Sequence, residues 1–275
     1  MTGIKFYKME GAGNDFVIID NRELQLSIEE IIAFTPVLCH RRFGIGADGL
    51  IALESPQIEG VDYTMVYRNA DGSDAGMCGN GSRCLALFAS THGFGSAQTF
   101  NVHNSVYKAE VNLQKNLVSV SFPDVSLPAN IRVDNQQLVQ VYTGTEHVVS
   151  FVASDQLDKE PELVTIGSAI RNHDSLNPPG TNVNFVCKTD HSAIRLQTYE
   201  RGVEDLTLAC GTGAIASAIA AHFSSQNNQT NNNYLVRVEG GDLNVSFKFN
   251  ADKKIYTNIE LSGPANFVFE GKVNV

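Results

Sequence analysis

The sequence has little positive charge. Its 275 residues include 20 lysines and arginines against 30 aspartates and glutamates, so the formal net charge is −10 at pH 7. A protein that binds nucleic acid needs a basic face to displace the counterions of the phosphates, and no basic run interrupts this acidic balance. We therefore expect no nucleic-acid partner.

Long hydrophobic runs are also missing. A transmembrane helix needs about 20 mostly apolar residues, and nowhere in this sequence do 18 uncharged apolar residues occur in a row. The first residues, MTGIKFYKMEGAGNDF, carry Glu10 and Asp15 where a signal peptide would need an apolar segment. We expect a cytoplasmic protein without a membrane partner.

Cysteine is scarce, and its spacing fits neither a disulfide framework nor a zinc site. There is no C-x-x-C pair, and the seven histidines are not spaced like zinc ligands. An odd number of scattered cysteines is unusual in a secreted protein. We expect reduced thiols and no metal at the five positions Cys39, Cys78, Cys84, Cys187 and Cys210.

Hydrophobic residues, by contrast, are frequent. Hydrophobic residues make up 43% and charged residues only 18% of the chain, which is typical of a folded protein with a large core. At roughly 150 residues per domain, the length suggests two domains. Polar or proline-containing segments predict loops at 54–60, 123–128, 172–180 and 224–233, and the second of these is the best domain boundary.

Short β-branched or alternating runs dominate the sequence and indicate many strands in an α/β protein. Four stretches favour helices, at 27–40 with Ser27 as N-cap, 78–91, 162–173 and 210–224. The second and fourth begin with cysteine and are almost entirely small or apolar, so each is expected to be buried in the middle of a domain. Strands are expected at 4–9, 16–20, 50–53, 63–67, 106–113, 117–122, 147–152, 184–187, 193–200, 235–238, 243–249 and 255–261.

The two helices that begin with cysteine belong to an internal sequence repeat. YRNADGSDAGMCGNG (67–81) recurs as YERGVEDLTLACGTG (199–213), with Tyr67 and Cys78 each 132 positions before Tyr199 and Cys210. Each copy runs from a strand through a polar loop to C-G-x-G and a small-residue helix. This repeat predicts two similar domains that face each other across a pseudo-twofold axis, with equivalent elements meeting at a cleft.

Cysteine at a helix start has a specific chemistry. The first N–H groups of a helix lack partners within the helix and carry about half a positive charge, which lowers a thiol pKa and attracts carboxylates. Glycines next to each cysteine let a ligand approach the backbone. A thiolate and a thiol on opposite sides of a carbon can take a proton from one face and return one to the other, which inverts a stereocentre.

Six blocks of this sequence resemble the diaminopimelate epimerase family. They are MEGAGNDFVIID (9–20), RRFGIGADGL (41–50), NADGSDAGMCGNGSRC (69–84), TGTEHVVSFV (143–152), GTNVNFV (180–186) and YERGVEDLTLACGTG (199–213). The resemblance implies an isomerase that interconverts LL- and meso-2,6-diaminopimelate in lysine and peptidoglycan precursor synthesis. It implies no pyridoxal phosphate or other cofactor, a small amino-acid substrate and, as a possibility, a homodimer.

The resemblance also implies a fold and a set of site residues. Each domain would be a curved, mostly antiparallel sheet around a central helix, with domains at 1–123 (joined by about 264–275) and 124–263 and the active site in the cleft between them. Cys78 and Cys210 would be the acid/base pair, and His147 would support them. Substrate contacts would come from Asn14, Asn69, Gly79, Asn80, Asn182, Glu200, Arg201, Gly211 and Thr212.

Three departures from the family pattern bear on the substrate. Many members have Gly-Asn-Pro-His where this chain has GTEH (144–147), so an asparagine near the distal end of the substrate is missing. Gly49 replaces a pocket glutamine of some members, and Arg68 stands where an aromatic residue is common. A racemase for another amino acid on the same scaffold is therefore an alternative.

Other interpretations remain open at this point. GIGADG (44–49) fits the dinucleotide motif G-x-G-x-x-G, but CHRRF precedes it and a strand-like run follows, so we interpret it as a turn. A non-catalytic carboxylate or nucleotide binder is the alternative from another functional class. Several candidates also have structural interpretations: Cys39, Cys84 and Cys187 as core, Asn14 and Asn182 as turn residues, Glu200–Arg201 as an ion pair, and His147 as a hydrogen-bonded strand residue.

Overall fold

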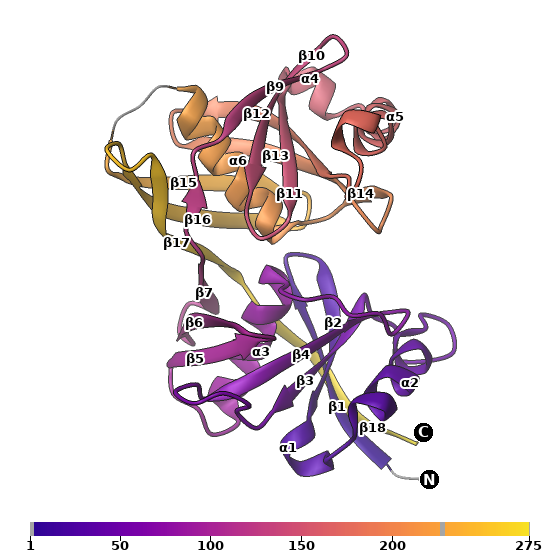
Figure 1. Cartoon of the computed structure of the whole chain (residues 1–275). Coiled ribbons are helices and arrows are strands. Elements are labelled where there is room, and N and C mark those ends of the chain that lie inside the picture. Colours follow the sequence, from indigo (N-terminus) through magenta and orange to yellow (C-terminus); the bar gives the residue numbers. More distant parts are fainter. Residues whose placement is uncertain (1–2, 226–228, 275) are drawn as a thin grey trace. The chain divides into compact units, whose positions relative to one another are not determined.

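The computed structural model describes residues 3–225 and 229–274 and divides the chain into two compact units (Figure 1). The first unit comprises Met1–Val120 and Gly263–Val275, and the second comprises Ser121–Ser262. Both contain helices and a mixture of parallel and antiparallel strands, so the expected α/β class is confirmed. Each unit is described in turn.

The strands of the first unit form one continuous series of pairings. β1 pairs with β18 and β2, β2 runs parallel to β3, β3 is antiparallel to β4, and β4 runs parallel to β5. β5, β6 and β7 continue antiparallel. The strands are β1 (Gly3–Gly11), β2 (Asn14–Asp20), β3 (Gly49–Glu54), β4 (Tyr63–Asn69), β5 (Ala97–Val102), β6 (Ser105–Asn112), β7 (Leu117–Phe122) and β18 (Asn266–Asn274).

The second unit repeats this order of pairings. β9 and β10 are antiparallel, as are β10 and β11; β11 runs parallel to β12, β12 is antiparallel to β13, and β13 runs parallel to β15. β15, β16 and β17 continue antiparallel, with β14 added beside β13 and β8 beside β17. The strands are β8 (Val125–Ser126), β9 (Ala129–Val133), β10 (Gln136–Tyr142), β11 (Glu146–Phe151), β12 (Asn182–Asp190), β13 (Ala193–Glu200), β14 (Asp205–Thr207), β15 (Asn231–Val238), β16 (Gly241–Asn250) and β17 (Ile255–Pro264).

Helices occupy the parallel crossovers, where a connection between parallel strands needs the length of a helix. The second crossover of each unit contains the helix that opens after a cysteine (Figure 1). α3 packs against β1, β2 and β6, and α6 packs against β10, β11 and β12. The helices are α1 (Asn21–Leu24), α2 (Ile28–Cys39), α3 (Gly79–Thr91), α4 (Ser154–Leu157), α5 (Glu160–Arg171), the short 3₁₀ helix η1 (Asp174–Leu176) and α6 (Gly211–Ser224).

α3 and α6 are buried almost from end to end, as their composition predicts. Residues 79–89 of α3 and ten consecutive residues of α6, Gly213–His222, are buried. Small side chains allow the strands to approach such a helix closely. A Cβ atom at Gly81 would come within 2.8 Å of the Ile51 side chain, so alanine would not fit there without a shift.

The first turn of α2 confirms the Ser27 N-cap. The Ser27 hydroxyl accepts a hydrogen bond from the Glu30 amide, while the Glu30 carboxylate accepts one from the Ser27 amide. This reciprocal pair is the capping box, and it satisfies two amides that the helix itself leaves open. The helix predicted at 162–173 is also present as α5 (Glu160–Arg171), which begins and ends two residues earlier than predicted.

Several strand and loop predictions need correction. β5, β10 and β18 were not expected, because their polar residues obscure the alternation. β18 also pairs with β1, which lies at the other end of the sequence. The loop expected at 224–233 is shorter, since Ser224 ends α6 and β15 begins at Asn231. Residues 226–228 of that prediction lie outside the described residues.

The core of each unit is continuous and apolar. Ile4, Val17 and Leu50 are among the buried residues of one cluster in the first unit, and Val148, Val183 and Phe185 are among those of a cluster in the second. In the described ranges, 3–225 and 229–274, the structure contains no helix that is long and apolar enough to cross a bilayer.

Arg83 is one of the polar residues buried within this largely apolar interior. It lies on α3 and is fully buried, and its guanidinium donates to the Asn80 side chain (3.0 Å) and to the carbonyls of Gly79 and Pro264 (both 3.3 Å). Burial lowers the pKa of Arg83, because the charged form loses its hydration. The side chain thereby ties the start of α3 to the C-terminal segment of the same unit.

We predict that Arg83→Met lowers the free energy of unfolding by about 3 kcal/mol, because buried acceptors lose a charged donor. The measurement is urea unfolding followed by fluorescence and circular dichroism. Arg42→Met, at an exposed loop position of the same unit, is the matched control and should leave the midpoint nearly unchanged. Equal midpoints for the two variants would contradict the anchoring role.

Candidate functional site

Cys78 is the residue immediately before α3. Its backbone is extended (φ −122°, ψ 116°), and its sulfur accepts the Gly81 amide at 3.4 Å, so the thiol itself caps the helix. The sulfur also lies 3.8 Å from the Asn14 Oδ1 atom. The thiol is half-buried and faces the end of the helix where unpaired N–H groups concentrate partial positive charge.

Asn14 connects this thiol to an ionic cluster. Its amide nitrogen donates to Asp48 (2.5 Å), and its Oδ1 atom also accepts from the Asn80 side chain (3.4 Å). Asp15 lies next to Asn14; burial raises the pKa of this carboxyl, but hydrogen bonds from Arg41 and Lys8 outweigh that effect and lower it to about 2. The cluster holds the Asn14 side chain in a fixed orientation beside Cys78.

The other candidates of the first unit divide into two groups. Gly79 and Asn80 are in the first turn of α3 and are buried, next to Cys78. Asn69 is at the end of β4, where its amide group and its backbone both bond to Ser73 (3.0 Å each) in the following turn. These bonds give Asn69 a turn-stabilising role.

Cys210 occupies the equivalent place before α6. Its backbone angles (φ −120°, ψ 113°) nearly equal those of Cys78, and the residue is 8% exposed. Its sulfur lies 3.6 Å from the Thr212 hydroxyl, while the Thr143 hydroxyl donates to the Thr212 carbonyl (3.4 Å). Gly213 is required here, because a Cβ atom would come within 2.5 Å of the Asn184 side chain.

His147 lies on β11, fully buried in the second unit. Its Nδ1 atom is 3.0 Å from the Asn184 amide nitrogen, which is a donor, so Nδ1 accepts and the proton resides on Nε2. Burial, reinforced by the charge of Arg201, lowers the pKa of His147 to about 3. The imidazole is therefore neutral at pH 7. Its buried Nε2 atom has no hydrogen-bond partner among the described residues.

Arg201 follows β13 and has a dense set of partners. Its guanidinium pairs with the Glu146 carboxylate (2.9 Å) and bonds to the Thr145 hydroxyl (3.0 Å). Asn182 joins the same two loops through the backbone, because it donates to the Glu146 carbonyl (3.0 Å) and accepts from the Arg201 amide (2.9 Å). Glu200 is the last residue of β13, beside Arg201.

Sequence reasoning missed four of the residues that hold these candidates. Asp48 orients Asn14, Asn184 orients His147, and Thr145 and Glu146 hold Arg201. A partial signal existed for Asn184, since it follows Asn182 at the two-residue spacing of one strand face. GIGADG is confirmed as a turn, because α2 precedes it and β3 begins at its last glycine.

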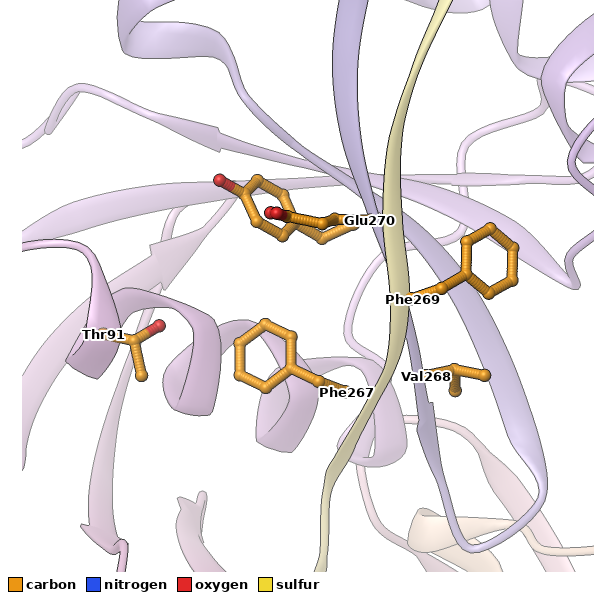
Figure 2. Close-up of a pocket in the computed structure, with 6 residues that line it drawn as sticks. Thr91, Phe267, Val268, Phe269 and Glu270 are labelled. Carbon is orange, nitrogen blue, oxygen red and sulfur yellow. The ribbon is translucent and has the colours of Figure 1, made fainter.

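A cavity of about 360 Å³ in the first unit is separate from these candidates. Figure 2 shows its lining: Phe267 projects from β18 on the same side as Thr91, whereas Phe269 and Val268 project from the other side of the strand. Tyr7 and Glu270 complete the lining, and none of the candidate site residues takes part.

None of the five cysteines forms a disulfide. The described residues contain no cluster of three or more histidine, cysteine or acidic side chains placed to hold a metal ion.

Comparison with solved structures defines the class of fold. A phenazine biosynthesis protein of the PhzF family from Bacillus anthracis superposes with a TM-score of 0.76 at 14% identity and covers 100% of both chains. A hydroxyproline epimerase from Agrobacterium vitis superposes with a TM-score of 0.73 at 13% identity, over 98% of this chain and 92% of the other. The fold is the mixed α/β fold that these two proteins share.

Sequence comparison identifies the particular family. The family model described as diaminopimelate epimerase matches residues 6–127 and 139–268. A diaminopimelate epimerase of Flavobacterium psychrophilum is 44% identical over 97% of this chain and 99% of its own length, and one of Chlorobaculum tepidum is 39% identical over 97% and 100%. The chain belongs to the diaminopimelate epimerase family, which is a family of isomerases.

The state of His147 has a measurable consequence for stability. The folded protein keeps the imidazole neutral down to about pH 3, whereas in the unfolded chain it takes up a proton below about 6.5. His147 therefore contributes stability above pH 6.5 that is lost as the pH falls from 6.5 toward 3, by up to about 1.4 kcal/mol per pH unit.

We expect the free energy of unfolding, measured with denaturant at pH 7, 6 and 5, to fall more steeply in the wild type than in His147→Gln. The variant has no titrating group at this position, so it lacks this component of the pH dependence. Identical slopes would mean that His147 is protonated in the folded state as readily as in the unfolded one.

Proposed function

We propose that this isomerase interconverts LL- and meso-2,6-diaminopimelate by direct proton transfer, with Cys78 and Cys210 as the two bases. The observation that carries the assignment is the matched placement of the two thiols. Each precedes a buried helix, with nearly equal backbone angles, and is followed by a glycine at the first helical position. The same chemistry is thus available twice in one chain.

The reaction needs only protons to balance. A thiolate takes the α-proton from one face of the substrate, and the thiol on the opposite face delivers its own proton to the same carbon. The electron pair of the broken C–H bond resides in the carbanion-like intermediate until the second proton arrives. After one turnover the two sulfurs have exchanged protonation states. Proton exchange with solvent, or a turnover in the opposite direction, regenerates the starting form.

Backbone donors would stabilise the intermediate. The α-proton of an amino acid is very weakly acidic, so charge that develops on the carboxylate must meet preorganised N–H groups. Gly79 and Asn80 at the start of α3, and Gly211 and Thr212 at the start of α6, supply such groups. Asn14 would orient the substrate beside Cys78, because the ionic cluster holds its side chain rigidly.

The proposal includes an arrangement of the two units. We take them as pseudo-symmetric domains, each a curved sheet around a central helix, with the active site in the cleft between them. The repeated order of strand pairings and the 132-residue offset between the cysteines support this duplication. The mechanism requires both thiols to reach one α-carbon.

The remaining assignments concern the distal end of the substrate and the cellular setting. Arg201 would grip the distal carboxylate, with Asn69, Asn182 and Glu200 nearby, and His147 would support the thiols as a neutral donor. The activity belongs to lysine biosynthesis; a role in peptidoglycan precursor synthesis, a cytoplasmic location and a homodimer are further predictions. Sedimentation velocity tests the homodimer.

We predict that Cys78→Ala and Cys210→Ala each lower the rate of epimerisation at least about a thousandfold, since either change removes one of the two required proton carriers. The measurement is the conversion of LL- to meso-2,6-diaminopimelate, followed by chiral chromatography, beside exchange of the α-hydrogen in deuterated water, followed by NMR. Cys39→Ala and Cys187→Ala are matched controls, because these buried cysteines do not open a helix; both should keep activity near wild type.

Retained epimerisation in either variant would contradict the two-base assignment. A panel of other amino acids in the same assay tests the substrate. Exchange confined to a substrate without a second amino-acid head would favour a racemase of different specificity, and binding without exchange would favour a non-catalytic carboxylate binder.

A further inference from the structure

We infer that Arg83 is a positioning residue for the reaction, whose buried positive charge favours the reactive thiolate form of Cys78. Arg83 does not contact the substrate in this proposal; it acts through the electrostatic field at the first turn of α3. The inference rests on the proposed function, because it takes Cys78 as one of the two bases. It concerns only the first unit, where both residues lie.

The Arg83 guanidinium reaches back to the helix start that follows Cys78. Arg83 lies one turn along α3, and its Nη1 atom donates to the Gly79 carbonyl at 3.3 Å. Gly79 is the next residue after Cys78, and the Cys78 sulfur accepts the Gly81 amide of the same turn at 3.4 Å. The guanidinium and the thiol therefore contact the same helical turn.

Two amide side chains connect the guanidinium to the sulfur. The Arg83 Nη2 atom donates to the Asn80 Oδ1 atom at 3.0 Å. The Asn80 amide nitrogen donates to the Asn14 Oδ1 atom at 3.4 Å, and that oxygen lies 3.8 Å from the Cys78 sulfur. Because the guanidinium occupies the Asn80 oxygen, the amide nitrogen of Asn80 faces Asn14. The order of groups between the charge and the sulfur is thus fixed.

The charge of Arg83 has no acidic partner. The side chain is fully buried, and its hydrogen bonds within the described residues go to neutral groups of Gly79, Asn80 and Pro264. A guanidinium keeps its proton in proteins, and a buried cation favours negative charge nearby. Burial lowers the pKa of Arg83, whereas negative charge on Cys84, Cys78 or Glu10 raises it. The interaction is mutual, so the guanidinium favours the thiolate of Cys78 in return.

The other two groups that could supply the negative charge are less suited to it. Cys84 is fully buried, and burial raises its pKa far above the physiological range, so it stays a thiol. Glu10 on β1 is only half-buried, and its carboxylate already bonds to the Gly13 amide (3.0 Å) and the Asn266 side chain (2.5 Å). Cys78 is partly exposed at a helix start, where a thiol ionises most readily.

The remaining charges around α3 are paired or exposed. Behind Asn14, the carboxylates of Asp15 and Asp48 are matched by the cations of Lys8 and Arg41. The other charged groups on the strands packed against α3 are bonded elsewhere or exposed: Lys5 pairs with Glu270, Asp20 with Arg22 and Arg68 with Asp74, Glu54 bonds to Asn21, and Lys108 and Glu110 are exposed. Arg83 is thus the buried charge without an ionic partner in the described part of this helix.

Asn14 has an opposing effect. Its Oδ1 atom favours the protonated thiol, because a carbonyl oxygen can accept a hydrogen bond from S–H but repels a thiolate. The contact is long, at 3.8 Å, and the oxygen already accepts from Asn80. In a site of low dielectric a full charge outweighs a neutral dipole, so we expect the guanidinium to decide the protonation state.

The test follows the alkylation of Cys78 by iodoacetamide as a function of pH in the full-length Cys210→Ala protein. Mass spectrometry identifies the modified residue, since the other three cysteines are buried. Only the thiolate reacts, so the midpoint of the rate profile gives the pKa of Cys78. We expect this midpoint to lie below about 8.5, the value of a free cysteine.

Replacement of Arg83 should move this midpoint upward. In the same Cys210→Ala parent, Arg83→Gln removes the charge and keeps a hydrogen-bond donor, and we expect the midpoint to rise by about one pH unit. Arg83→Lys keeps the charge and should stay within about 0.3 pH unit of the parent. Leu87→Ala, at a buried position of the same helix, is the matched control: it destabilises α3 without changing any charge and should leave the midpoint unchanged.

An unchanged midpoint in Arg83→Gln would overturn the inference, and so would an equal rise in Arg83→Lys or Leu87→Ala. A midpoint at or above about 8.5 in the Cys210→Ala parent would overturn it as well, and this measurement needs no variant of Arg83 to fold. Failure of the proposed function has a different signature, namely that Cys78→Ala still converts LL- to meso-2,6-diaminopimelate.

Discussion

The unpaired N–H groups at the start of a buried helix are the constraint on which this structure depends. α3 and α6 are surrounded by strands of their own units, so their first amides cannot all be hydrated and need partners or ligands. At α3 the Cys78 sulfur is one such partner. The same placement that satisfies the helix also puts a thiol where negative charge is stabilised, and the proposed chemistry follows from this coincidence.

The two helix starts are alike in backbone and different in surroundings. Cys78 is held among Asn14, Asn80 and the ionic cluster behind them, whereas Cys210 lies beside the Thr212 hydroxyl. Arg83, buried on α3, has Ile215 as its counterpart 132 positions later on α6. A duplicated frame with different side chains therefore gives the two thiols different surroundings.

The Arg201–Glu146 pair illustrates how a family fold accommodates a change in a motif. An exposed ion pair contributes little stability by itself, because water and salt screen it. Asn182 holds the backbones of the two residues together, and the Thr145 hydroxyl holds the guanidinium.

Local sequence patterns predicted the elements whose signals lie within a short stretch of the chain. These are the Ser27 N-cap, the apolar helices after Cys78 and Cys210, and strands such as β3 and β13 with their β-branched runs. They also revealed the internal repeat, because a repeat can be recognised from the sequence without coordinates. They could not reveal β18 beside β1, since this mixed polar strand is defined by hydrogen bonds to a partner at the other end of the chain.

The sequence by itself determined the α/β class, the family and the two cysteines that precede buried helices, because each depends on the order and spacing of residues along the chain. Only the tertiary structure decided which side chains hold the candidates: Asp48 for Asn14, Asn184 for His147, and Glu146 with Thr145 for Arg201. These partners come from different strands and loops, and their distances and their burial, on which the neutral state of His147 depends, exist only once the sheets have formed.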